Sequence, residues 1–152
     1  MFLPSTVKSI EFRAFNDCRS LRLLILPHDI DLNKVGNGII DETAIYQIAE
    51  NAGVAYEEYE WGDITAESNL RVNEWLFHHM DAVPLHKLCS DSTVTTKQIN
   101  DYLHEHGNDS ALAIDTIRGM TPLHILSMNP HAPPDTILTL LKADINAANV
   151  ED

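Results

Sequence analysis

The residues of this chain best suited to chemistry are its eight histidines and two cysteines. Four of them lie in one stretch of the second half and combine imidazole and thiol groups, the usual ligands of zinc. These candidate ligands are His86, Cys89, His104 and His106. Structural zinc sites usually contain two closely spaced ligand pairs, and only His86 and Cys89 form such a pair. A zinc-binding protein is therefore the weaker alternative, and the favoured interpretation has no metal and no other cofactor.

The sequence contains none of the short motifs that are typical of hydrolases, zinc proteases or nucleotide-binding loops. Cys89 and His86 could form a catalytic dyad, but residues three apart on a helix of a repeat are both needed for packing. The glycine cluster Gly36-Asn37-Gly38 has no lysine after it and predicts a turn. We therefore predict a protein that is not an enzyme.

Acidic residues dominate the charge of the chain. Ten lysines and arginines oppose 23 aspartates and glutamates, so the formal net charge is −13. Such a surface repels the phosphates of nucleic acids and of anionic lipids, so neither a nucleic acid nor a membrane is an expected partner. A basic protein would associate faster with this surface than a neutral one. The acidic run of Glu57, Glu58 and Glu60 is expected to be a solvated face, because it lacks the ligand spacing of a calcium loop.

The cellular location follows from the cysteines and the N-terminus. Cys18 and Cys89 lie far apart in stretches of different pattern, which is unlike a disulfide framework. The N-terminus has no basic segment followed by an apolar one, as a secretory signal would. No apolar run approaches the roughly 20 residues that cross a bilayer. We expect reduced thiols and a cytoplasmic protein.

Apolar residues in the first third of the chain recur at a nearly constant spacing. The pairs are Ile10 with Val35 and Phe15 with Ile40, 25 positions apart, and Leu21 with Ile45 and Leu24 with Ile48, 24 positions apart. Short apolar segments separated by turn residues predict small strand-containing units. Such units must stack, because one unit buries too little apolar surface alone.

The first unit resembles the leucine-rich repeats of the BspA type, which follow the pattern I-x-x-x-A-F-x-x-C-x-x-L-x-x-I-x-L-P. The matching residues are Ile10, Ala14, Phe15, Cys18, Leu21, Leu24, Leu26 and Pro27. The second unit departs from the pattern, with Ile39-Ile40 in place of Ala-Phe and Thr43 in place of Cys. The resemblance implies about two leucine-rich units over residues 1–59. As in other repeats, Phe15 and Cys18 are expected to be buried in the core.

Residues 60–82 are expected to form a linker and a capping helix. Val72, Leu76 and Met80 recur every four residues and give one apolar stripe, which predicts a helix over about 66–80. Stacked repeats expose their end faces, so this helix is expected to cover the repeats that follow it.

The segment that begins at Asp115 resembles one ankyrin repeat, with the pattern D-x-x-G-x-T-P-L-H-x-A, two helices, and an ending like Ala143-Asp144-Ile145-Asn146-Ala147. The central motif consists of Thr121, Pro122, Leu123 and His124, and a weaker copy lies 38 positions earlier at Pro84, Leu85 and His86. The resemblance implies about two ankyrin-like repeats over residues 83–152. It also implies that the motif histidine bonds within its turn and ties neighbouring repeats together.

Helix-start signals support this assignment. Thr121 before Pro122 predicts an N-cap followed by proline at the first helical position. Thr95 and Gln98 predict a capping box ahead of a helix over about 96–105. Pro133-Pro134 predicts another helix start, and that helix is expected to end in a turn at Asp144.

Together these features predict an α+β repeat protein, in which a short leucine-rich stretch with small β units precedes mainly α ankyrin-type helix-turn-helix repeats. The ankyrin resemblance implies a non-enzymatic scaffold that binds a protein partner through its finger loops and concave face. Arginine and methionine are enriched in interface cores, which singles out the finger between the two repeats. The predicted contact residues are Asp115, Thr116, Arg118 and Met120. Asp115 could equally close the turn by bonding backbone amides. The alternative function is a structural fragment of a longer repeat protein with no independent activity.

Overall fold

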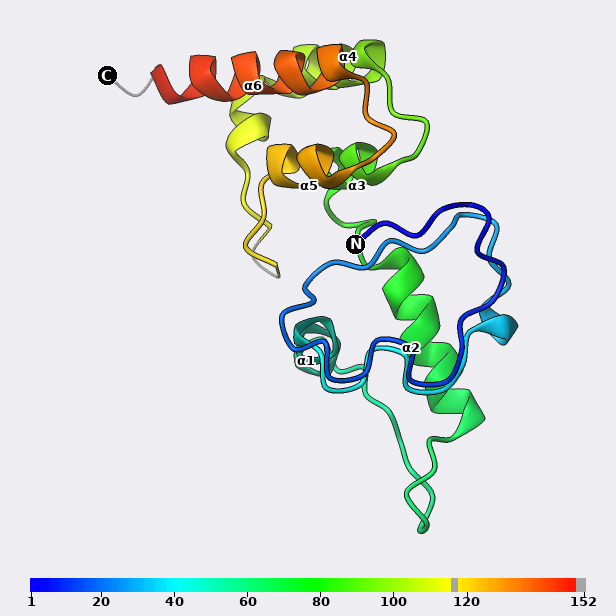
Figure 1. Ribbon diagram of the computed structural model, residues 1–152. Coiled ribbons are helices and arrows are strands. Elements are labelled where there is room, and N and C mark those ends of the chain that lie inside the picture. The colour runs from blue at the N-terminus through cyan, green and yellow to red at the C-terminus, as the bar shows by residue number, and fades with distance from the viewer. Residues whose placement is uncertain (116–117, 150–152) are drawn as a thin grey trace. The chain divides into compact units, whose positions relative to one another are not determined.

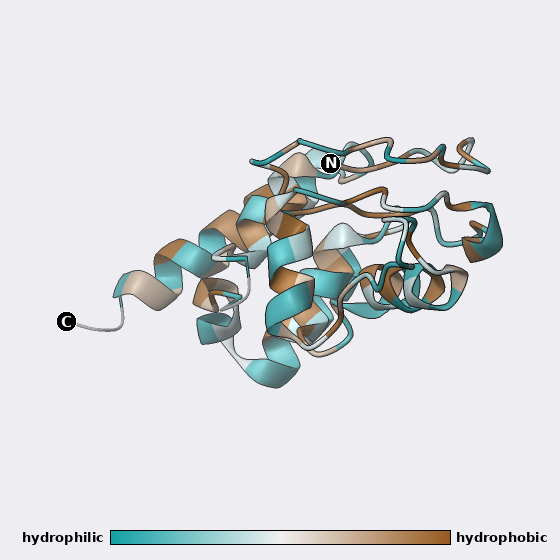
Figure 2. Cartoon of the chain, turned by 90° about the horizontal axis from the view of Figure 1, so that it is seen from below, coloured by the Kyte–Doolittle hydropathy of each residue, from teal (hydrophilic) through white to brown (hydrophobic). Residues whose placement is uncertain are grey.

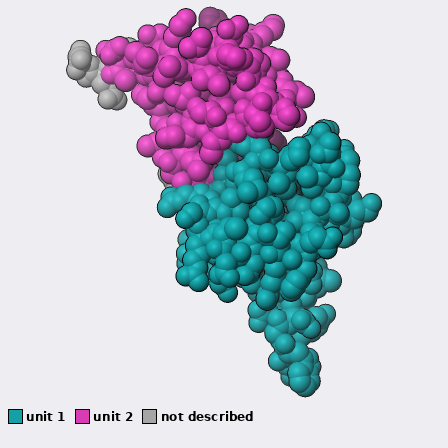
Figure 3. All heavy atoms as spheres, in the orientation of Figure 1, with its two compact units in different colours: residues 1–79 teal, residues 80–152 magenta. Residues whose placement is uncertain are grey.

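A computed structural model describes residues 1–115 and 118–149 of the chain. It divides into two compact units, Met1–His79 and Met80–Asp152, coloured separately in Figure 3. In the described part, no helix is both long and apolar enough to pass through a bilayer. Each unit is built in a different way.

Unit 1 begins with two coils of chain that lie side by side (Figure 1). The backbone amides of Ile10, Arg13 and Phe15 donate to carbonyls of residues 34, 37 and 39, each at 3.0 Å. Ile10 and Val35 form a parallel bridge, so the residues paired by the 25-position spacing do lie beside each other. Gly36 sits at the closest approach, where an added Cβ would lie 2.6 Å from the backbone nitrogen of Phe12.

The two coils also share their backbone conformation. Arg13 and Gly38, which are 25 positions apart, both have a left-handed φ, of 52° and 66°. Asp17 and Glu42, again 25 positions apart, have φ values of 62° and 55°. Because non-glycine residues adopt this region at a cost, the same unusual turns at the same offset show that the coils repeat one backbone path.

The predicted α+β class with small β units is wrong. Among residues 1–115 and 118–149 there is no sheet, and β pairing is limited to isolated bridges such as Phe2 with Ile25 and Ile10 with Val35. The left-handed residues turn the chain every few positions, so a ladder of successive bonds cannot form. Cys18, expected in the core, is exposed, and Phe15 is only half-buried.

Three short helical segments complete unit 1: η1 (Leu32–Lys34), α1 (Ala44–Asn51) and α2 (Ala66–His78). Helix α2 was expected to cover the repeats that follow. Within unit 1, Val72 and Leu76 of this helix are fully or almost fully buried in the apolar core, together with Ile10 and Val35.

Helix α2 also completes the backbone hydrogen bonding of the second coil. Gly38 donates its amide to Asn69 Oδ1 at 3.2 Å, and Asn69 and Asn73 each donate to the Val35 carbonyl at 3.4 Å. Asn69 and Asn73 are both buried. The two amide side chains therefore supply the partners that a third coil would otherwise provide.

Unit 2 consists of two helix pairs and a short connection between them. The first pair is α3 (Pro84–Ser90) and α4 (Thr96–His106), the second is α5 (Pro122–Met128) and α6 (Pro134–Ala148), and η2 (Asn108–Leu112) lies between the pairs. Helix α3 packs on α5, and α4 packs on α6 (Figure 1). The two pairs therefore stack with the first helix of one on the first helix of the other, and the second on the second.

Polar side chains reinforce this stacking at positions about one repeat apart. Asn129, which is buried, donates from Nδ2 to the carbonyls of Cys89 at 3.0 Å and Asp91 at 2.8 Å. At the start of α4 and α6, the hydroxyls of Thr96 and Thr136 lie 2.8 Å apart. Both contacts join equivalent ends of the stacked helices.

The end of α6 differs from the ankyrin pattern. Residues 143–147 were expected to lead into a turn, but the helix continues through them to Ala148. Leu140, Ala143 and Ala147 are buried and recur on one face, so packing favours continued helix at these positions.

Candidate protein-binding surface

A hairpin between η2 and α5 corresponds to the finger predicted from the sequence. Asp115 donates its amide to the Met120 carbonyl at 2.9 Å, and the two residues form an antiparallel bridge. Gly119, with φ of 67°, donates its amide to the Asp115 carbonyl at 2.7 Å. A left-handed residue is needed at this point of the turn, and glycine adopts that conformation readily.

The inside of this hairpin is charged. Asp115 and Arg118 form an ion pair and are 3% and 2% exposed. Burial lowers the pKa of Arg118 to about 10. Both residues were predicted to contact a partner, whereas in this structure their side chains are buried and paired with each other. The aspartate three positions before the arginine draws the guanidinium inward, and pairing makes burial of both charges tolerable.

His86 ties the hairpin to helix α3. Its Nε2 lies 2.9 Å from the Met120 carbonyl, and its side chain is buried. Burial lowers the pKa of His86, the neighbouring Arg118 charge lowers it further, and the bond to the Met120 carbonyl opposes both effects. A neutral ring that donates from Nε2 suits this site. His86 therefore forms a hydrogen-bonded strut between α3 and the hairpin, which are 34 positions apart in sequence.

The other two predicted contact residues of the finger are Thr116 and Met120. Thr116 lies outside the described residues. Met120 is half-buried. The hairpin instead displays Ile114, which is 62% exposed and which the sequence analysis did not select. The sequence around Ile114 contains several apolar residues, including Leu112 and Ile117, and nothing in it showed which of them the fold would expose.

The four motif residues at 121–124 shape the start of α5. Thr121 caps the helix by accepting from the His124 amide at 3.3 Å, with Pro122 at the first helical position. His124 Nδ1 accepts from the Thr121 amide at 3.0 Å, which closes the capping box. Leu123 is half-buried beside them.

The weaker copy of the motif behaves differently. Pro84 starts α3, while Leu85 and His86 are both buried. Val83, at the N-cap, makes no side-chain capping bond. The histidine is therefore not used at the helix start and bonds the hairpin instead.

The alternative zinc ligands are not brought together. Among the residues that the structure describes, no group of three or more histidine, cysteine or acidic side chains could hold a metal ion. Cys89 is fully buried, and burial raises the pKa of its thiol to about 12. His104 and His106 are exposed on α4. A buried, protonated thiol is a poor ligand and a poor nucleophile.

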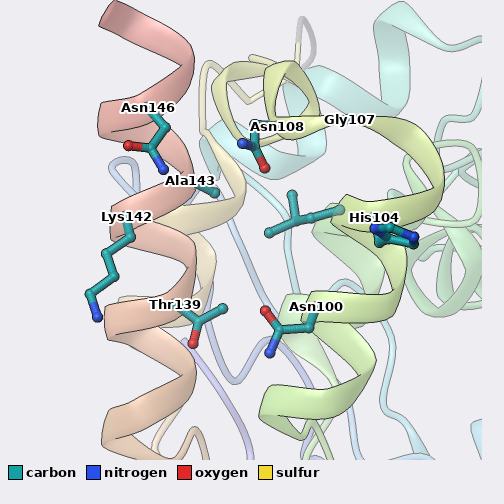
Figure 4. Close-up of a pocket in the computed structure, with 9 residues that line it drawn as sticks. Asn100, His104, Gly107, Asn108, Thr139, Lys142, Ala143 and Asn146 are labelled. Carbon is teal, nitrogen blue, oxygen red and sulfur yellow. The ribbon is translucent and has the colours of Figure 1, made fainter.

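A polar groove of about 540 Å³ runs between α4 and α6 (Figure 4). Its walls carry carboxamides, a hydroxyl, an imidazole and an ammonium group, from Asn100, Asn108, Asn146, Thr139, His104 and Lys142. Leu103 and Ala143 contribute apolar surface. Carboxamides can bond both the N–H and the C=O of a peptide backbone. No motif predicted this groove, because the residues that line it are scattered over 47 positions of sequence.

The outward face of α6 is apolar. Leu138, Leu141 and Ile145 recur at helical spacing and are 51%, 38% and 51% exposed. In Figure 2 the helix that leads to the C-terminus carries both hydrophobic and hydrophilic bands. Exposed apolar rows of this kind mark surfaces on which another element can pack.

Comparison with known proteins adds no relative. No protein-family model, no curated protein and no solved structure matches the chain.

Proposed function

We propose that this chain is a non-enzymatic scaffold, and that unit 2 consists of ankyrin-type repeats that bind a protein partner. The like-on-like stacking of α3 on α5 and of α4 on α6 supports the assignment to repeats. The histidine strut from α3 to the next hairpin supports it as well. We propose a cytoplasmic location with it, because Cys18 and Cys89 are not joined in a disulfide.

The observation that carries the binding function is the construction of the hairpin. Asp115 and Arg118 form a buried ion pair within it, and His86 bonds the Met120 carbonyl at its end, whereas Ile114 is 62% exposed. An apolar side chain on a backbone that is already hydrogen-bonded loses less entropy when a partner covers it. We assign the partner contact to Ile114 and the exposed hairpin backbone around Gly119, in place of Asp115 and Arg118.

The test is affinity capture from a lysate, comparing the wild-type chain with Ile114→Asp. An aspartate at a central apolar contact should reduce retention of a specific partner by at least about tenfold. Leu138→Asp is the matched control, because Leu138 is 51% exposed on α6 and lies outside the hairpin. Equal retention by the wild type and Ile114→Asp, with both proteins folded by circular dichroism, would refute the hairpin as the contact.

A second candidate is favoured by the apolar row on α6. Leu138, Leu141 and Ile145 could be covered by a further helix pair, in which case unit 2 acts as a structural part of a longer repeat stack. Under this alternative the Leu138→Asp control, and not Ile114→Asp, abolishes capture. The same experiment therefore separates the two candidates.

A further inference from the structure

A second hairpin, in unit 1, projects between α1 and α2 (Figure 1). The Tyr59 amide donates to the Asp63 carbonyl at 2.8 Å, and the Gly62 amide donates to the Tyr59 carbonyl at 2.9 Å. Glu58 and Ile64 form an antiparallel bridge below this turn. Gly62 has φ of 82°, a left-handed conformation that glycine adopts readily. The tip is thus a defined turn.

The base of this hairpin is fixed to the start of α2. The Glu57 amide donates to Ser68 Oγ at 3.0 Å, and the Thr65 amide donates to the Glu57 carbonyl at 2.8 Å. Ser68 is fully buried and Ile64 is 6% exposed. Thr65 is at the same time the N-cap of α2. The hairpin is therefore held by the helix that it precedes.

The tip displays two aromatic side chains to solvent. Trp61 is 89% exposed, more than any other large apolar residue that the structure describes, and Tyr59 is 60% exposed. In Figure 3 the hairpin forms a narrow projection from unit 1. Tryptophan is the side chain most often found at interface hot spots, because its large rigid surface loses little entropy on binding. Neither aromatic residue belongs to the core of unit 1.

The charges around Trp61 indicate what it binds. Residues 57–63 carry four exposed carboxylates, from Glu57, Glu58, Glu60 and Asp63, and no lysine or arginine. Only Glu57 has a basic neighbour in unit 1, at 3.1 Å from Arg71. An indole surrounded by carboxylates suits a guanidinium, which can stack on the ring and pair with carboxylates at its edge. Anionic lipid headgroups would be repelled, which argues against insertion of Trp61 into a membrane.

We propose that the hairpin of residues 57–64 is a docking element for an arginine-rich segment of a partner protein. Trp61 stacks on an arginine side chain, and the carboxylates of Glu58, Glu60 and Asp63 pair with its neighbours. The fixed base holds the tip in the geometry needed for binding, so little ordering accompanies association. This site belongs to unit 1 and does not depend on the hairpin proposed for unit 2.

The experiment titrates the full chain with nona-arginine, nona-lysine and nona-glutamate and follows the indole N–H signals by NMR. The chain has two tryptophans, Trp61 and Trp75, so Trp61→Ala assigns both signals. Nona-arginine should shift the Trp61 signal and bind more tightly than nona-lysine. The affinity for nona-arginine should be about fivefold weaker in Trp61→Ala than in the wild type. Phe12→Ala is the matched control, because Phe12 is 61% exposed in the same unit. It should change affinity by less than about twofold.

A second comparison separates a local site from general attraction to an acidic protein. Glu58→Gln with Glu60→Gln removes two charges from the hairpin, and Glu67→Gln with Glu74→Gln removes two from the exposed face of α2. Only the substitutions in the hairpin, Glu58→Gln with Glu60→Gln, should substantially weaken the affinity for nona-arginine. Equal losses for both pairs, or unchanged affinity in Trp61→Ala, would overturn the proposal. Binding of the wild type to phosphatidylcholine or phosphatidylserine vesicles through Trp61 would overturn the choice of a protein partner.

Discussion

His86 is the residue on which the geometry of the unit 2 hairpin depends most directly. It is 3% exposed, and its Nε2 bonds the Met120 carbonyl across 34 positions of sequence. Burial and the Arg118 charge both favour the neutral ring. Protonation would place a cation beside the buried Arg118 guanidinium. The stability of the hairpin therefore depends on the protonation of His86.

Protonation of His86 makes the stability of the fold depend on pH. The pKa of His86 is lowered from 6.5 in the folded chain, so the unfolded chain takes up the proton first as the pH falls. Its contribution to stability is therefore complete above about pH 6.5 and is lost as the pH falls below that value, by about 1.4 kcal/mol for each unit by which the pKa is lowered. Urea unfolding between about pH 7.5 and about pH 5.5 should show this loss in the wild type, and a smaller one in His86→Gln.

His104→Gln supplies the control for this experiment, because His104 is exposed on α4. It should keep the full pH dependence of the wild type. If His86→Gln retained that dependence too, His86 would not be its source.

Some of the hairpin was predictable residue by residue, and some was not. Thr121, Pro122 and His124 act locally, because a helix start is decided by residues within four positions of each other. The inward turn of Arg118 depends on the carboxylate of Asp115 and on the burial provided by surrounding helices. Sequence indicated a residue type common at interfaces, but it could not indicate which side chains the fold would enclose.

At the scale of elements, α6 presents two contrasting faces. Leu140 is fully buried, whereas Leu138, two positions earlier, is 51% exposed. The same substitution at both positions therefore separates packing from helix propensity.

Leu140→Ala should lower the free energy of unfolding by about 2–5 kcal/mol, because it removes buried apolar surface and leaves a cavity. Leu138→Ala should change it by less than about 0.5 kcal/mol, because the side chain is half in solvent and alanine favours helix. Urea unfolding monitored by circular dichroism measures both. Equal losses would mean that the face of Leu138 is covered in solution.

Helices were the most predictable elements of this fold. The Thr95–Gln98 capping box and the helix from Thr96 were indicated by a few adjacent residues, and the helix ends at His106, one residue beyond the expected position. Helix α2 starts at Ala66 as expected, but no local pattern showed that Asn69 and Asn73 would bond the second coil. Those bonds join residues more than 30 positions apart, so they depend on the tertiary arrangement.

Over the whole molecule, the strongest feature is the charge of −13. Charges of one sign repel each other more in the compact chain than in the unfolded one. The exposed ion pairs, such as Lys87 with Asp81 and Lys97 with Asp101, each contribute at most about 1 kcal/mol in the opposite direction.

Sodium chloride should therefore raise the melting temperature of the chain, because salt shortens the range of repulsion to about 10 Å near 0.1 M. Glu67→Gln with Glu74→Gln reduces the magnitude of the net charge without changing a buried residue. The melting temperature of this variant should rise less with salt than that of the wild type. Thermal melting in a series of salt concentrations tests both. A melting temperature that fell with salt would show that ion pairs outweigh repulsion.

The shared path of the two coils in unit 1 also limits how this protein can change length over evolution. Backbone amides of Ile10, Arg13 and Phe15 meet carbonyls 24 positions later, and the left-handed turns recur after 25. Deleting a single residue between Phe15 and Leu21 would move the following donors and apolar side chains out of register with the next coil. Insertions and deletions that survive in this part of the chain should therefore comprise whole coils.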